Sequence, residues 1–294
     1  MGKKNRPALG GQLLILLAGS FWGSMGLFVR RLNALGFSSR QVACLRLTVG
    51  ALVFVLLLLI LDRKALKIYP RDLPLFLGLG LLSVLFFTFC YFRAIELMPL
   101  ATAAILLYTS PIWVTLMAAL CFHERLTARK LLALGLAFAG CVLVSGISGE
   151  GITVTGLLIG LGSGIGYGLY SILGTVALKK YSPYTVTAYT FLFAAAGSWL
   201  VCGAGDMIGH FAAAENLGFL LLFCCLTALV TAVIPFLCYT LGLRRVEASR
   251  AGILATVEPL VAALVGVLVF AEPLTLTAGI GIALILAGAV TINN

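Results

Sequence analysis

The chain has 294 residues, of which 62% are hydrophobic and only 10% are charged. A soluble domain has about 25% charged residues and could not bury so much apolar surface, so the composition excludes an ordinary soluble protein and indicates a lipid bilayer as solvent. The net charge of +10 lies in short basic clusters between apolar runs, which fits membrane topology and not a nucleic-acid site.

Ten apolar runs are long enough to cross a bilayer as helices, which takes about 20 residues. The first run follows a basic start and continues to Val29, too far for the apolar region of a secretory signal, so we expect it to be a transmembrane helix. The predicted spans are 9–29, 41–61, 73–95, 100–121, 131–147, 152–177, 184–204, 217–241, 249–270 and 275–292. The sequence therefore predicts an all-α membrane protein with ten transmembrane helices, in which 205–216 is the longest connection.

The basic residues are distributed unequally between the two sets of loops. With the N-terminus inside, fifteen Lys and Arg residues lie on the inner side, and only Arg30, Arg31 and Arg40 lie in outer loops. Because basic loops remain in the cytoplasm, we expect a multi-pass protein of the plasma membrane with both termini cytoplasmic.

The sequence contains an internal duplication. Shifting the chain by 148 positions aligns residues 90–143 with 238–291 without a gap and gives 16 identities, including the pairs Cys90/Cys238, Tyr91/Tyr239, Pro111/Pro259, Glu124/Glu272 and Gly140/Gly288. A shift of 145 aligns Gly19, Trp22 and Gly23 with Gly164, Tyr167 and Gly168. We therefore predict two repeats, at 9–148 and 151–293.

Each repeat has five spans, an odd number, so the second repeat must be inverted relative to the first. The matched segments 122–130 and 270–278 support this, because only the first contains basic residues and would lie inside. Inverted repeats around a midplane site are typical of secondary transporters.

Two prolines and one carboxylate indicate where a transport site would lie. Pro111 and Pro259 stand at equivalent mid-span positions, where each removes a backbone donor and bends its helix; simple packing kinks are the alternative. Glu258 precedes Pro259 and is the one carboxylate near the middle of a span, at a cost of about 3 kcal/mol. It is expected to bind a substrate ammonium or to couple protons, unless it is a structural group held by Arg46 or by hydroxyls.

Arg46 lies early in the second span, and we expect its side chain to extend to the outer membrane interface. Burial beside the cavity is the alternative, which would make it a charge-coupling partner of Glu258. Arg93 and Glu96, three residues apart, are expected to pair with each other.

Amphipathic aromatic side chains inside the spans are candidates to line a substrate cavity. They can stack on planar or cationic molecules, although packing or interface anchoring is the ordinary role of any single one. The candidate substrate-binding aromatics are Trp22, Tyr91, Tyr108, Tyr167 and Tyr239. Glycines at four-residue spacing from Gly156 to Gly168 are expected to allow close helix packing.

Signs of catalysis or of a bound cofactor are absent from the sequence. His123 and His210 lie in different loops, no metal or triad spacing occurs, and no phosphate-binding GxxxxGK[ST] motif is present. We predict no catalytic residues, no metal site and no cofactor, and we interpret the eight cysteines as buried apolar residues. Glu124 and Glu272 are expected to be structural, capping the following helix or pairing with a loop donor.

The sequence resembles the EamA family of the drug/metabolite transporter superfamily. The resemblance rests on Pro111-Ile-Trp, Glu124-Arg-Leu-Thr and Gly140, on their copies Glu258-Pro259, Glu272-Pro-Leu-Thr and Gly288, and on Trp22-Gly23 and Arg46. It covers nearly the whole chain. It implies a ten-helix inverted-repeat carrier, commonly an exporter of amino acids or related metabolites, in which helices 1, 3, 4, 6, 8 and 9 surround a central cavity.

We therefore predict a secondary transporter that exports small metabolites by alternating access. A passive channel is the main alternative, and a membrane-embedded enzyme is a weaker one. The expected partners are a small-molecule substrate and lipid but not nucleic acid, and protons and a second copy of the chain are left open. The resemblance does not identify the cargo.

Overall fold

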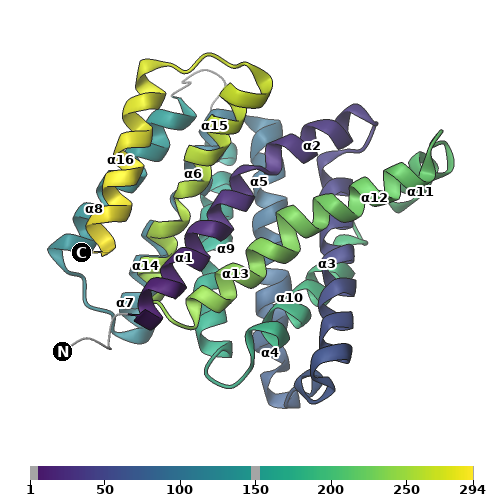
Figure 1. Cartoon of the computed structure of the whole chain (residues 1–294), viewed down its shortest axis with the longest axis horizontal. Coiled ribbons are helices and arrows are strands. Elements are labelled where there is room, and N and C mark those ends of the chain that lie inside the picture. The colour runs from purple at the N-terminus through teal and green to yellow at the C-terminus, as the bar shows by residue number, and fades with distance from the viewer. Residues whose placement is uncertain (1–5, 147–152, 294) are drawn as a thin grey trace.

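The computed structural model describes residues 6–146 and 153–293, and every regular element in these ranges is a helix (Figure 1). Lys3 and Lys4, and the ends of two predicted spans at 147 and 152, lie outside the described residues.

Residues 6–146 form eight α-helices and three other helical segments. The α-helices are α1 (Arg6–Gly23), α2 (Met25–Ala34), α3 (Ser39–Leu61), α4 (Leu73–Leu77), α5 (Phe86–Leu97), α6 (Leu100–Leu107), α7 (Ser110–Phe122) and α8 (Ala128–Ser145). Two short 3₁₀ segments, η1 (Arg63–Leu66) and η2 (Pro70–Asp72), precede α4, and a π-helix, η3 (Gly78–Leu85), joins α4 to α5.

Residues 153–293 form eight further α-helices with one π-helix among them. They are α9 (Val154–Ala177), α10 (Pro183–Ser198), α11 (Ala204–Ala212), α12 (Leu217–Ala228), α13 (Ile234–Leu243), α14 (Ala248–Ala255), α15 (Val257–Phe270) and α16 (Leu276–Asn293). The π-helix η4 (Leu229–Val233) lies between α12 and α13.

Eight segments within the described ranges are long and apolar enough to span a membrane. They are Leu9–Ala34, Ser39–Leu61, Pro70–Leu97, Leu100–Phe122, Ala128–Ser145, Val154–Ala177, Leu217–Leu243 and Ala248–Phe270. The other two predicted spans correspond to shorter helices, the apolar Leu276–Ile292 and α10. The helix α10 ends at Ser198 and not at 204, because the chain turns there and Gly203, with φ of 70°, starts α11.

The helix boundaries repeat with the same 148-residue shift as the sequence. This shift moves α6 onto α14 and α8 onto α16 at both ends. It also pairs the two described non-glycine residues with positive φ, His123 at 57° and Ala271 at 53°. The duplication therefore extends to the local backbone conformation.

The equivalent helices α8 and α16 lie side by side (Figure 1). A β-carbon at Gly140 would lie 2.6 Å from the Gly281 carbonyl oxygen, and one at Gly288 would lie 2.9 Å from the Ala133 carbonyl oxygen. Residue numbers therefore rise along one helix as they fall along the other, and the two helices are antiparallel. The glycines allow their backbones to touch, as helices in lipid require.

The main core joins the two halves of the chain. The helix α3 packs against α10, α1 against α13, and α5 against α9. Gly50 of α3 makes room for the ring of Phe191, because a β-carbon there would lie 2.5 Å from that ring. Phe191 packs edge-on against Phe236, which in turn lies beside Trp22. This core leads directly to the aromatic groups of the candidate site.

Candidate functional site

Two of the long spans are broken at equivalent places. The helix α6 ends at Leu107 and α7 begins at Ser110, while α14 ends at Ala255 and α15 begins at Val257. Pro111 and Pro259 stand in the first turn of the downstream helices α7 and α15, where the missing backbone donor costs nothing. Each span therefore places a helix end inside the bundle.

Glycines bring α1 and α9 into contact with these breaks. A β-carbon at Gly23 of α1 would lie 2.5 Å from the carbonyl oxygen of Glu258. A β-carbon at Gly168 of α9 would lie 3.2 Å from the carbonyl oxygen of Ser110, the residue that corresponds to Glu258 in the first repeat. The glycine spacing therefore places the site-forming helices α1 and α9 directly against the two helix starts.

Three of the five candidate aromatics come together around Trp22. The centroid of the Trp22 ring lies 5.9 Å from that of Tyr167 and 5.4 Å from that of Tyr239. Phe236 completes the group at 5.2 Å, and together these rings form what we call the aromatic cage. They line a cavity of about 20 Å³, together with Ser110 and Ser171, which has room for about one water molecule.

Glu258 lies at the edge of the aromatic cage and is half-buried. Its carboxylate accepts a hydrogen bond of 3.1 Å from the hydroxyl of Tyr167. It occupies the first turn of α15, where the helix dipole favours a negative charge. Ser110 occupies the same place on α7, so the two helix starts carry a carboxylate and a neutral hydroxyl.

Tyr91 and Tyr108 do not join the aromatic cage. Tyr91 lies on α5 beside the small cluster of Ala94 and Met98, and Tyr108 lies at the break after α6 beside Cys141. Both are half-buried and close enough to Glu258 for an electrostatic interaction. They surround the carboxylate at longer range than Tyr167 does.

Arg46 is turned into the bundle, and the expectation that it extends to the membrane interface is wrong. Its guanidinium donates a hydrogen bond of 2.6 Å to the carbonyl oxygen of Thr231, within the π-helix η4. In an α-helix this carbonyl would accept from residue 235, but Pro235 has no backbone N–H to donate. Nε of Arg46 is buried without a partner, and no ion pair within 4.0 Å joins Arg46 to Glu258, although their charges interact at longer range.

The sequence interpretation missed the hydroxyl groups behind the aromatic cage. The hydroxyl of Tyr239 bonds with that of Ser171 at 2.7 Å, and the hydroxyl of Tyr170 bonds with that of Thr240 at 2.7 Å. These bonds fix the orientation of the cage wall. Ser110 could have been found from the repeat, because the 148-residue shift pairs it with Glu258, but Ser171 carries no such signal.

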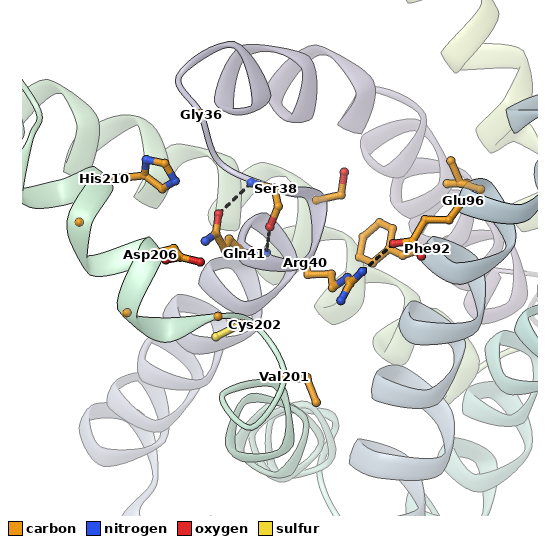
Figure 2. Close-up of a pocket in the computed structure, with 15 residues that line it drawn as sticks. Gly36, Ser38, Arg40, Gln41, Phe92, Glu96, Val201, Cys202, Asp206 and His210 are labelled. Atoms are coloured by element: carbon orange, nitrogen blue, oxygen red, sulfur yellow. Dashed lines mark hydrogen bonds and ion pairs between the residues drawn. The ribbon is translucent and has the colours of Figure 1, made fainter.

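A larger cleft of about 950 Å³ opens elsewhere, at the end of the bundle where α3 begins (Figure 2). We call this the Arg40 end, because Arg40 of α3 pairs there with Glu96 of α5 at 2.7 Å. Glu96 also pairs with Arg93 at 2.7 Å, as predicted. Asp206 and His210 of α11 form the opposite wall, and the cleft shares no lining residue with the aromatic cage.

Metal ligands do not gather in the part of the chain that the structure describes. No three His, Cys, Asp or Glu side chains in residues 6–146 and 153–293 lie close enough to hold an ion.

Comparison with known proteins identifies the family. The sequence model of the EamA-like transporter family matches the chain twice, over residues 9–146 and 154–294. The chain belongs to the EamA-like transporter family. The resemblance inferred from the duplicated Pro, Glu and Gly motifs is thereby confirmed.

Two transporters with similar sequences match nearly the whole chain, and a third matches part of it. An uncharacterized transporter of Archaeoglobus fulgidus is 34% identical over 278 residues, which cover 95% of this chain and 94% of the relative. The uncharacterized transporter YwfM of Bacillus subtilis is 26% identical over 283 residues, which cover 96% of this chain and 93% of YwfM. The pseudopaline exporter CntI of Pseudomonas aeruginosa is 31% identical over 116 residues, about 40% of either chain.

A solved crystal structure shares the fold of this EamA-like protein. It superposes with a TM-score of 0.78 at 22% sequence identity, and the match covers 96% of this chain and 95% of the other.

Proposed function

We propose that this EamA-like transporter is a secondary carrier that exports small zwitterionic metabolites, such as amino acids, by alternating access around Glu258. In this proposal the chain crosses the plasma membrane ten times as two inverted repeats, 9–148 and 151–293, with both termini in the cytoplasm. The observation that carries the proposal is the hydrogen bond from Tyr167 to Glu258 at the break between α14 and α15. Broken helices that meet at the middle of inverted repeats are where transporters bind substrate.

The antiparallel packing of α8 and α16 supports the inversion. These helices are equivalent in the two repeats, and yet they run in opposite directions. A direct repeat would place them parallel. Exchange of conformation between two such halves produces the opposite-facing state of a carrier.

Unequal packing at the two ends of the bundle supports alternating access. The end at which α7 meets α8 is called here the Lys130 end, and there α7 packs along α14. The equivalent pair at the Arg40 end, α15 and α6, has no comparable packing. Under the proposed orientation the carrier is closed on the cytoplasmic side and open on the outer side.

The two helix starts at the breaks match the two charges of a zwitterion. Glu258 on α15 offers a carboxylate to a substrate ammonium, which the aromatic cage also favours through cation–π attraction. The start of α7 at Ser110 offers the positive end of a helix dipole to a substrate carboxylate, with no acidic side chain in its first turn. Because the aromatic cage holds about one water, its rings must separate when substrate enters.

The relatives support the direction of transport. CntI carries the name of a pseudopaline exporter, and part of this chain is 31% identical to it. We extend export, but not pseudopaline itself, to the present protein.

Counterflow in liposomes tests the proposal. The purified protein is reconstituted with unlabelled amino acids inside, and uptake of labelled amino acids, purines and cationic metabolites is measured against concentration. Wild type is compared with Glu258→Gln, and Glu215→Gln serves as the matched control, because Glu215 is exposed in the turn between α11 and α12. We expect saturable counterflow that Glu258→Gln reduces by about tenfold or more, the effect of one lost charge-assisted contact.

The outcomes separate the alternatives. Flux that rises linearly with concentration would indicate a channel. Saturable counterflow that Glu258→Gln leaves at the level of Glu215→Gln would retain a carrier and remove Glu258 from its site.

A further inference from the structure

Glu124 and Glu272 are equivalent residues that stand in the same local structure. Each follows a residue in the left-handed conformation, His123 or Ala271. The backbone N–H of Glu124 donates to the carbonyl oxygen of Ala118 at 3.3 Å, and that of Glu272 donates to the equivalent carbonyl oxygen of Gly266 at 3.1 Å. The two carboxylates are therefore attached to the same local backbone structure. Any difference in their contacts comes from the residues of the other repeat that face them.

Glu124 is half-buried, and its carboxylate contacts the other repeat. Its carboxylate accepts hydrogen bonds from the backbone N–H of Ala248 at 3.1 Å and from the hydroxyl of Ser249, and so caps the start of α14. Lys130 joins Glu124 at 3.0 Å to Glu247 at 2.7 Å. The expectation that Glu124 caps the following helix is therefore wrong, because Thr127 caps α8 and Glu124 caps α14 of the second repeat.

Glu272 lies at the Arg40 end, and its side chain pairs with Arg30 instead of with a helix start. Its carboxylate pairs with Arg30 at 2.9 Å, and its side chain is 49% exposed, against 10% for Glu124. The helix that it would cap by symmetry is α6, which starts at Leu100 and whose own N-cap residue, Pro99, gives no side-chain hydrogen bond. The first backbone N–H groups of any helix have no partner within that helix, so its start can be capped by a residue from elsewhere.

We propose that Glu124 and Glu272 are alternating helix caps that hold the two ends of the carrier closed in turn. In the state described here Glu124 caps α14 and closes the Lys130 end, while Arg30 holds Glu272 aside. In the opposite state Glu124 releases α14, and Glu272 leaves Arg30 to cap α6 at Leu100. This inference rests on the proposed alternating-access cycle and assigns to the two residues a positioning role.

The two caps are unequal in strength. The positions that correspond to Glu247, Ser249 and Lys130 are Pro99, Ala101 and Ala278. A cap formed by Glu272 would therefore have neither the hydroxyl donor nor the lysine ion pairs of the cap formed by Glu124. Without substrate the carrier therefore rests with the Lys130 end closed, as in this structure.

Hydrogen–deuterium exchange of the full-length protein in lipid nanodiscs tests the inference without any substrate. The readouts are the amides of 248–255, at the start of α14, and of 100–107, at the start of α6. Glu124→Gln, which retains the size of the side chain, should speed exchange in 248–255 about fivefold, the factor expected for one lost cap. Glu272→Gln should leave 248–255 unchanged, because Glu272 does not act in the resting state.

Arg30→Ala provides the opposite perturbation. Release of Glu272 should slow exchange in 100–107 and speed it in 248–255, as the population shifts toward the opposite state. The double variant Arg30→Ala/Glu272→Gln should lose both effects. Thermal unfolding of each variant identifies any that fail to fold, and the Arg30 and Glu272 variants alter only exposed side chains.

The inference is overturned if Arg30→Ala changes the two segments equally with and without Glu272, or if Glu124→Gln leaves 248–255 as protected as wild type. Slower hydrogen exchange in 100–107 without faster hydrogen exchange in 248–255 would also contradict the inference, because one end of the bundle would close without the other opening. If counterflow fails for every substrate, but the effect of Arg30→Ala on hydrogen exchange still requires Glu272, the alternating caps are supported and the proposed carrier function is refuted.

Discussion

Gly23 is the position where a single added methyl group should disturb the site most directly. A β-carbon there would lie 2.5 Å from the carbonyl oxygen of Glu258 and 2.7 Å from Cβ of Val261. Ordinary van der Waals contacts between such atoms begin at roughly 3.5 Å. Gly23→Ala must therefore move α1 away from α15 by up to about 1 Å. The movement acts on the backbone of Glu258 and, one residue before Gly23, on the ring of Trp22.

The size of the effect follows from two opposing contributions. Overpacking of a rigid contact costs about 1–3 kcal/mol, and replacing a helical glycine by alanine returns about 0.5–1 kcal/mol. We therefore expect a net loss of up to about 2 kcal/mol, or a melting temperature lower by roughly 2–6 °C. Transport should fall by about ten- to a hundredfold, the effect of a displacement near 1 Å at an enzyme site.

Counterflow in liposomes and thermal unfolding in detergent measure the two effects on the same preparations. Gly26→Ala is the matched control, since a β-carbon at Gly26 has nothing within 4 Å. Gly168→Ala should reduce transport and melting temperature by an intermediate amount, because the nearest contacts of its β-carbon, at 3.1–3.2 Å, are longer than those at Gly23. If Gly23→Ala transports and melts like Gly26→Ala, then α1 and α15 are not in rigid contact at Glu258 and the reasoning fails.

Three further outcomes are expected. Gly140→Ala should lower the melting temperature by roughly 2–6 °C, because its β-carbon would meet the backbone of α16. Gly135→Ala on the same helix should leave the melting temperature unchanged, because its β-carbon would meet nothing within 4 Å. Equal melting temperatures for the two variants would contradict backbone contact between α8 and α16 at Gly140. Arg46→Met should cost about 1–3 kcal/mol in thermal unfolding, since it leaves a buried carbonyl oxygen of η4 unpaired, and unchanged stability would show that water replaces the guanidinium. The hydrogen bond and charge of Asp72 raise the pKa of Lys180 above its ordinary 10.5, so the pair stabilises the fold below that pH and the contribution is lost as pH rises above it. Melting of wild type and of Lys180→Met should therefore converge as pH rises from about 9 to about 11.5, and a constant difference would refute the linkage.

Much of the fold could be predicted because a bilayer leaves few choices. Backbone groups in lipid must be paired within a helix, so each apolar run near 20 residues becomes one, and the observed boundaries follow the predicted spans within a few residues for most of the chain. The span at 184–204 was predicted too long, since apolarity continues through Trp199 and Leu200 into a turn that only Gly203 marks.

The candidate site was predicted unevenly. Trp22 and Tyr167 were predicted as amphipathic aromatics inside spans, and the structure brings their rings together, with Tyr167 bonded to the half-buried Glu258. Tyr91 and Tyr239 are a repeat pair, but Tyr239 lies in the aromatic cage and Tyr91 does not. Equivalent sequence positions define equivalent places in each repeat, and they do not define the same distance from the other repeat.

The sequence by itself determined that this protein is a duplicated helical membrane protein of a transporter family, because hydropathy, prolines and the 148-residue repeat are local properties of the chain. Only the tertiary structure decided that Arg46 turns inward, that Gly23 touches the backbone of Glu258, and that Glu124 caps a helix while its equivalent Glu272 does not. The physical reason is that these features depend on the separation between the two repeats. That separation differs between the ends of the bundle, although the local sequence and backbone are the same.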